Sequence, residues 1–214
     1  MIDKIAYEIV KDLSTKVNFM DKWAGLVRPM RKKVQNADKV FPVAINTPSA
    51  CSVSDYMDLV PDSTKRSIVY VEMIGNPVVD VVRHHSKQLS ANLRLVVWYN
   101  LDLITEGQYV SEDILLDDIM DSLPASLSDS LFNGAQNVHF QITGIVYGTE
   151  IVSQYTYNEI KTQFGIHPYG MFAVDLDVWW IAVHCQPDIG ITEGCVTGKG
   201  GHTDYDLETE SEPA

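Results

Sequence analysis

Hydrophobic and polar positions alternate most clearly in residues 171–185, MFAVDLDVWWIAVHC. Every second position from Phe172 to Trp180 is apolar, whereas the other set of positions carries Asp175 and Asp177 before it becomes apolar again. Successive side chains of a strand point to opposite faces of its sheet. The pattern therefore predicts a long strand with one face on a core and the other only partly covered. We expect it to be the central strand of a mixed α+β domain.

Two further segments have the three- and four-residue spacing of amphipathic helices. The first covers residues 2–17. The second begins after Ser111, a good N-cap residue, has acidic residues in its first turn, and ends at Pro124. Its predicted buried stripe consists of Leu115, Leu116, Ile119, Met120 and Leu123.

Shorter alternating runs predict the remaining strands. Residues 40–45 form one, and Pro42 favours an edge position or one end of the sheet. Residues 68–73 and 78–82 form two more, joined by a hairpin turn at Gly75-Asn76-Pro77. The polar residues 46–66, between the strands at residues 40–45 and 68–73, are expected to be a long loop.

Two long strands are expected beside the central one. In residues 92–101, NLRLVVWYNL, Arg94 is expected across from Asp175 or Asp177. In residues 138–147, Phe140, Ile142 and Val146 are expected to point inward, and Gly144 indicates a bulge or a close approach of another backbone. Residues 127–132 are expected to form a short turn of helix.

Together these elements predict an α+β fold. We expect a mixed, mainly antiparallel sheet with the N-terminal helix and the central helix packed on one face, in a single domain of residues 1–186. Residues 187–214 are rich in glycine and then acidic. They are expected to form a flexible tail, or one that a partner orders.

Charge is distributed unevenly along this chain of net charge −13. Residues 1–40 contain nine of the 16 basic residues and five acidic ones, so the rest of the chain is strongly acidic. This balance excludes general binding of nucleic acid by the whole surface. The basic cluster of Arg28, Arg31, Lys32 and Lys33 is either a solvated loop or strand edge, or a contact for an acidic partner or DNA phosphate.

Cysteine usage and the N-terminus predict an intracellular protein. The three cysteines form no regular framework for disulfides, which favours a reducing compartment. The N-terminus lacks the apolar core of a signal peptide, and the longest apolar run is too short to span a membrane. We therefore expect a protein that is made or assembled in the cytoplasm and has no membrane contact.

Two segments resemble binding motifs but lack essential features. Residues 194–201, GCVTGKGG, have three residues where a phosphate-binding loop has four, and Gly200 follows Lys199 in place of Ser or Thr. His184 and Cys185 are adjacent in a strand and point apart, so with Cys195 and His202 they make a poor zinc site. We expect no metal and no cofactor.

Asp175 and Asp177 share one face of the central strand. Paired carboxylates can serve in acid–base or two-metal chemistry. No nucleophile motif, metal-binding helix motif or glycine-rich turn accompanies them in the sequence. We therefore expect a solvated or interface-facing pair and no catalytic residue.

The order of elements resembles a known family over residues 1–185. An amphipathic helix and short strands precede NLRLVVWYN, the helix SEDILLDDIMDSLP, a strand pair and the final strand MFAVDLDVWWIAV. This order is similar to that of the tail-terminator or tail-completion proteins of tailed bacteriophages and, more loosely, to neck and head–tail connector proteins. The resemblance implies a ring, a hexamer or dodecamer, that halts tube growth and joins tail to neck in the virion. It implies no catalytic residues.

The implied partners are other copies of the chain, the tail tube protein and neck or portal-adaptor proteins. DNA would pass through the ring without specific binding, because a negative lumen repels phosphate. The candidate residues for an acidic lumen are Asp117, Asp118, Asp121, Asp175 and Asp177. The basic cluster at residues 28–33 would then face an acidic neighbouring subunit.

Two other functions are compatible with the sequence. One is a non-catalytic scaffold or binding domain outside viruses, whose acidic tail engages a basic partner. The other is a small metal-dependent hydrolase that uses Asp175 and Asp177.

Overall fold

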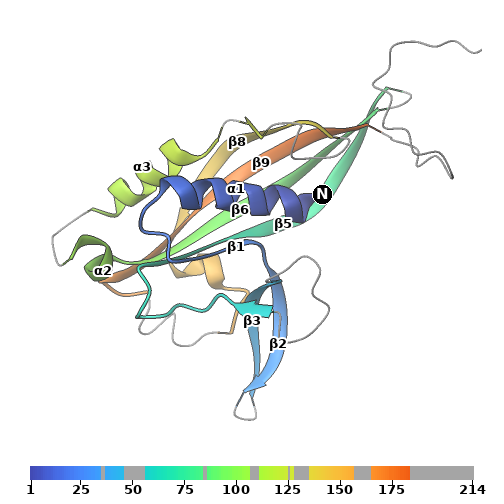
Figure 1. The fold of residues 1–214 in the computed structure, drawn as a ribbon. Coiled ribbons are helices and arrows are strands. Elements are labelled where there is room, and N and C mark those ends of the chain that lie inside the picture. Colours follow the sequence, from blue (N-terminus) through green and yellow to red (C-terminus); the bar gives the residue numbers. More distant parts are fainter. Residues whose placement is uncertain are drawn as a thin grey trace, which may run out of the picture.

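A computed structural model describes the fold of most of the chain outside its C-terminal segment. A larger sheet carries two α-helices on one face, and a smaller sheet and a 3-10 helix lie against the other (Figure 1). The residues that the structure describes are 1–34, 37–45, 56–83, 86–106, 111–124, 126–127, 135–156 and 165–183.

The larger sheet has six strands in the order β1-β5-β6-β9-β8-β7. Neighbouring strands are antiparallel, except that β1 runs parallel to β5. This mainly antiparallel arrangement confirms the predicted α+β class. The strands are β1 (Lys22–Leu26), β5 (Ser67–Arg83), β6 (Ser86–Asn100), β7 (Ser126–Leu127), β8 (Ala135–Tyr147) and β9 (Tyr169–Val183).

Strand β9 corresponds to the predicted central strand and lies between β6 and β8. Its apolar side, from Phe172 to Trp180, is buried in the core beneath the helices. On the opposite side Met171 is buried, whereas Asp175 and Asp177 are partly exposed. The expected difference between the two faces is confirmed.

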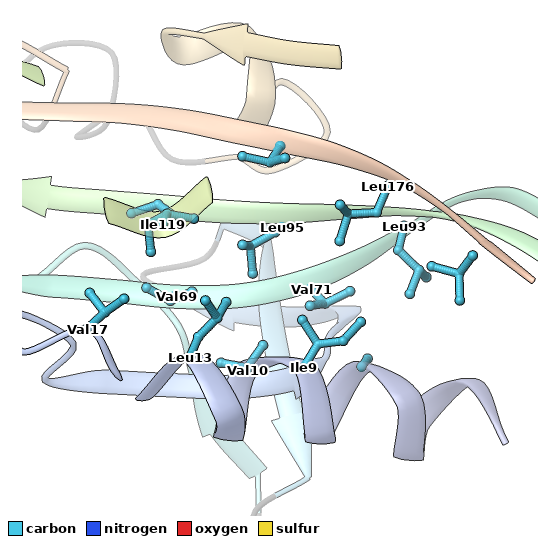
Figure 2. Packing of buried hydrophobic residues seen from close by; sticks show 14 of the residues in the cluster. Ile9, Val10, Leu13, Val17, Val69, Val71, Leu93, Leu95, Ile119 and Leu176 are labelled. Carbon is cyan, nitrogen blue, oxygen red and sulfur yellow. The ribbon is translucent and has the colours of Figure 1, made fainter. Parts of the chain in front are cut away.

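Helices α1 (Ile2–Lys16) and α3 (Glu112–Ser122) cover the same face of the larger sheet. The Ser111 hydroxyl accepts a hydrogen bond from the backbone N–H of Asp113, as expected for an N-cap residue. Figure 2 shows apolar side chains of α1 and Ile119 of α3 meeting those of β5, β6 and β9. Both predicted helices are confirmed. Their buried residues are Ile5, Ala6, Ile9, Val10, Leu13, Leu115, Leu116 and Ile119.

A second core lies under the other face of the larger sheet. It is covered by the 3-10 helix η3 (Thr149–Val152) and by a sheet of order β2-β3-β4, namely β2 (Arg28–Val34), β3 (Ala37–Ile45) and β4 (Tyr56–Asp58). This cover reaches the half of the face around Trp98 and Met171. The half around Asn92 and Asp177 is left partly open.

The hairpin predicted at Gly75-Asn76-Pro77 is wrong, because β5 runs through these residues. Its pairing with β6 continues on both sides, with a shift between Ile74 and Val78. Gly75 has a φ of 72°, which glycine adopts without a Cβ penalty. The three residues therefore form an irregularity within one strand, a bulge rather than a turn.

The strand containing Pro42 is not an edge strand, since β3 lies between β2 and β4. Pro42 is tolerated because it lies one residue past the end of the β4 ladder, which stops at the Val43–Asp58 pair. Its carbonyl oxygen accepts a hydrogen bond from Leu59. The basic cluster of Arg28, Arg31, Lys32 and Lys33 lies on β2, which is an edge strand of the small sheet. This position agrees with the interpretation of the cluster as a solvated strand edge.

The predictions for strand β8 are confirmed in part. Gly144 lies at a register shift in β8, so the predicted bulge is confirmed, but Val146 packs on the second core while Phe140 packs on the first. Ile142, expected inward, is 37% exposed. Leu127 lies in β7 (Ser126–Leu127), and the rest of the helical turn expected at residues 127–132 lies outside the described residues. Strand β6 leads directly into a short helix, α2 (Leu101–Thr105).

Several predictions concern segments outside the described residues. They include residues 46–55 of the expected loop at residues 46–66, and the tail at residues 187–214. The described part of that loop contains β4, which the sequence pattern does not predict. The glycine-rich segment 194–201, His184, Cys185, Cys195 and His202 also lie outside them.

Candidate functional site

A row of charged residues crosses the larger sheet on the face opposite the helices. Arg94 on β6 lies between Glu72 on β5 and Asp175 on β9 in the strand register. Its Nε and Nη2 donate hydrogen bonds of 2.6 and 2.9 Å to the two carboxylate oxygens of Asp175. Two parallel charge-assisted bonds fix both side chains, so the row is a rigid feature of this face.

Glu72 is the buried end of this row, with 6% of its surface exposed. It accepts hydrogen bonds from the hydroxyl of Tyr155 at 2.6 Å and from Nε2 of Gln154 at 2.8 Å. Burial raises the pKa of Glu72, and the effect exceeds the opposing influence of these bonds and of Arg94. Glu72 thereby ties the segment after η3 to strand β5.

The ion pair with Arg94 changes what Asp175 and Asp177 can do. Asp175 is occupied by Arg94, so the two residues do not offer a free carboxylate pair. Asp177 lies opposite Asn92 on β6 and Gln141 on β8 in the register. The geometry describes a polar sheet face rather than an acid–base pair.

Within the described ranges, no three His, Cys, Asp or Glu side chains are placed to hold a metal ion together. A small cavity beneath the small sheet has a largely apolar lining that includes Leu59, Tyr70, Trp98 and Met171. Most of these residues belong to the second core, so this cavity is a packing feature.

The five predicted lumen carboxylates do not lie on one surface. Asp117, Asp118 and Asp121 are exposed on α3, above the helix-covered face. Asp175 and Asp177 are on the opposite face of the sheet. The sheet therefore separates the five candidates into two groups, which do not form a single patch.

The outward surface of α3 has a distinct composition. Ile114 precedes Asp117 and Asp118 by three and four residues, and Asp121 follows them by four and three, so the four residues share one stripe. Ile114 is 52% exposed. None of these three aspartates forms an ion pair with another described residue. We call these four residues the α3 stripe.

The predicted basic cluster lies on β2, in a hairpin that extends away from the larger sheet (Figure 1). Arg28 forms an exposed ion pair with Asp3 at 3.2 Å. Arg31, Lys32 and Lys33 are exposed and form no ion pair with another described residue, and Lys33 lies opposite Asp38 in the β2–β3 register. We call β2 and β3 with these side chains the basic hairpin.

Sequence reasoning missed the two long edges of the larger sheet. Strand β1 pairs with β5 only over Ile68–Val71, so β5 has no described partner on that side from Glu72 onward. Strand β7 pairs with β8 only at Val138 and His139. Exposed apolar side chains accompany both open edges: Met73, Ile74, Val78 and Val79 on β5, and Ile142, Ile145 and Tyr147 on β8. We call these the two open edges.

A signal for the β5 edge was present in the sequence. Apolar residues continue past Gly75-Asn76-Pro77 in Val78 and Val79, beyond the reach of the five-residue β1. The β8 edge had no comparable signal, because its exposure depends on how short β7 is.

Comparison with known proteins gives no relative from which a role could be carried over. A scan of the chain against protein-family models found no match, and a search of curated proteins also found none. Of the helices in the described residues, none combines the length and apolar character that crossing a bilayer requires.

Proposed function

We propose that this chain is a non-catalytic structural protein of a tailed bacteriophage, and that it forms a ring at the head–tail junction through which DNA passes. It would act as a tail terminator or neck connector. Its partners would be other copies of itself, the tail tube protein and a neck or portal-adaptor protein. The resemblance in the order of elements suggests this role, and the surfaces of the fold support it.

The observation that carries the proposal is the presence of two different open edges on one sheet. An edge strand with exposed apolar side chains is a ready site for association. The β5 edge and the β8 edge differ in sequence and lie at opposite sides of the sheet. Two unlike surfaces favour head-to-tail contacts, and such contacts close into a ring when the rotation between subunits permits it.

The charge of the chain suits a passage for DNA. With a net charge of −13 the protein attracts phosphate poorly overall. The open half of the sheet face carries Asp177 with Asn92 and Gln141, and its Arg94 is already paired with Asp175. This face is our candidate for the lumen, since passing phosphate would find no unpaired cation in its charged row.

The alternative of a small hydrolase is less well supported. It needs Asp175 and Asp177 to act together, but Asp175 is held by both donors of the Arg94 guanidinium. Freeing it would leave Arg94 partly buried without its partner, which is costly.

The test is the mass of the full-length protein in solution over a range of concentrations, measured by light scattering, with negative-stain imaging of each species. The same protein is then mixed with tubes of the tail tube protein of the same phage. We expect a closed ring, alone or at tube ends. A monomer or dimer that neither closes at high concentration nor binds tube ends would contradict the proposal.

A further inference from the structure

We propose that the basic hairpin of one copy docks on the α3 stripe of a second copy. The inference rests on the proposed ring and deepens it, because it names one contact between neighbouring subunits. The occupant of the α3 stripe is thus the β2 strand of an identical chain, with Arg31, Lys32 and Lys33 as the residues that meet its carboxylates.

The basic hairpin carries an excess of exposed positive charge. Arg31, Lys32 and Lys33 are consecutive on β2, and Asp38, which lies opposite Lys33, is the one acidic residue opposite them in the β2–β3 register. Arg31 and Lys33 point to one side of the strand and Lys32 to the other, so cations project from both sides of this edge strand. A surface that supplies carboxylates would neutralise this excess.

The α3 stripe has the complementary imbalance. Asp121 follows Asp117 by four residues and Asp118 by three, and like charges at these spacings destabilise a helix. The helix contains no basic residue, and Glu112 and Asp113 add to its negative charge. Ile114, half exposed within the same stripe, adds an apolar contact that charge attraction alone would not give.

The two surfaces cannot meet within one chain. Helix α3 covers the face of the larger sheet that α1 also covers, whereas the basic hairpin belongs to the small sheet under the other face (Figure 1). Any contact between them is therefore between copies. Because the donor and acceptor surfaces differ, the contact is head-to-tail, which is the type that builds rings.

Two variants with opposite charge reversals test the contact. Lys32→Glu with Lys33→Glu reverses the hairpin, and Asp117→Lys with Asp118→Lys reverses the α3 stripe. We expect each pair of changes to weaken self-association by about tenfold or more, because like charges would then face each other across the contact. Combining all four changes in one chain should restore assembly, since the attraction is rebuilt with its sign exchanged.

A matched control reverses two exposed acids elsewhere, Asp102→Lys with Glu150→Lys, and should assemble like the unchanged protein. Association is measured by sedimentation at low and high salt, and folding by circular dichroism. If either pair of changes caused the chain to misfold, the fourfold variant would not assemble. Rescue in the fourfold variant therefore excludes misfolding as the cause of lost assembly.

The outcomes separate this inference from the proposed ring. If the unchanged protein forms rings but both reversals also do, the contact is wrong and the ring remains. If only the hairpin reversal disrupts assembly, the hairpin has another partner and the inference is overturned. The same holds if the hairpin reversal weakens binding to a short DNA duplex and leaves assembly intact. If no variant and no wild-type sample forms rings or binds tube ends, the proposed function itself fails.

Discussion

Arg94 and Asp175 face each other across β6 and β9, and the guanidinium donates hydrogen bonds of 2.6 and 2.9 Å to the two carboxylate oxygens. Each side chain keeps less than a quarter of its surface exposed. The pair links the central strand to its neighbour at the boundary between the buried and open halves of the sheet face. Arg94 also lies opposite the buried Glu72 in the strand register, where its charge opposes the rise in the pKa of Glu72 that burial causes.

Replacing Arg94 with methionine should lower the free energy of unfolding by about 1–3 kcal/mol, because Asp175 and Glu72 both lose their cation in a partly buried setting. Urea unfolding monitored by circular dichroism measures the change. The double variant Arg94→Met with Asp175→Leu should lose less than the sum of the two single changes. Strict additivity would mean that the two side chains are not coupled.

The raised pKa of Glu72 predicts a pH dependence of stability with a definite sign. Between its ordinary pKa and the raised folded-state pKa, the folded protein holds a proton that the unfolded chain has lost. The contribution of Glu72 to stability is therefore full below this window and falls as pH rises through it. Urea midpoints of the wild type and of Glu72→Gln, measured across mildly acidic to neutral pH, should diverge, with the variant gaining relative stability as pH increases.

The variant Glu150→Gln serves as the control for this comparison, because it removes a carboxylate that is exposed on the surface. Identical slopes for wild type and Glu72→Gln would contradict the assigned role of burial at Glu72.

Gly25 on β1 is fixed by the close approach of α1. A Cβ atom at this position would lie 2.9 Å from the Cα and the backbone nitrogen of Tyr7. Gly25→Ala should therefore lower stability by about 1–3 kcal/mol, since the helix must move away from the strand. Gly144→Ala is the matched control, because its nearest neighbour would be 4.0 Å away. In equilibrium unfolding, the free energy of unfolding of this control should lie within about 0.5 kcal/mol of the wild-type value.

The open β5 edge gives a prediction about assembly. Val78 and Val79 are 55% and 53% exposed, so changing both to lysine should alter the stability of the monomer by only about 0.5 kcal/mol. In the proposed ring, however, the same change places charge on an edge that a neighbour covers, and lysine is a residue that blocks edge pairing. Light scattering should find the folded variant unable to assemble. If the variant forms rings of normal mass, the β5 edge is not part of the interface between subunits.

The sequence was most informative where one face of an element is fully buried. The alternation from Phe172 to Trp180 predicted β9 and the identity of its core side, and the spacing in residues 2–17 predicted α1. The partner of Arg94 could be narrowed to Asp175 or Asp177, because both strands were predicted and opposite charges on facing positions attract.

The failures arose where tertiary context decides between local alternatives. Gly75-Asn76-Pro77 has the composition of a turn, yet β6 pairs with the residues on both sides of it, and this pairing favours one continuous strand. Asp117 and Asp175 lie on opposite sides of the larger sheet because α3 covers the face that Asp175 does not share. The periodicity of a helix does not specify which face of a sheet the helix will cover. The open β8 edge depends on the length of β7, so it could be recognised only once the strand order was known.

The irregularity in β5 has a consequence for how the protein behaves at high concentration. Pro77 has no N–H group, and the displaced residues around Gly75 break the regular row of backbone donors and acceptors. A second strand can therefore extend along this edge only over short stretches, so stacking of copies into an endless sheet is disfavoured. Strand β5 thus limits growth into fibrils even though its edge is open.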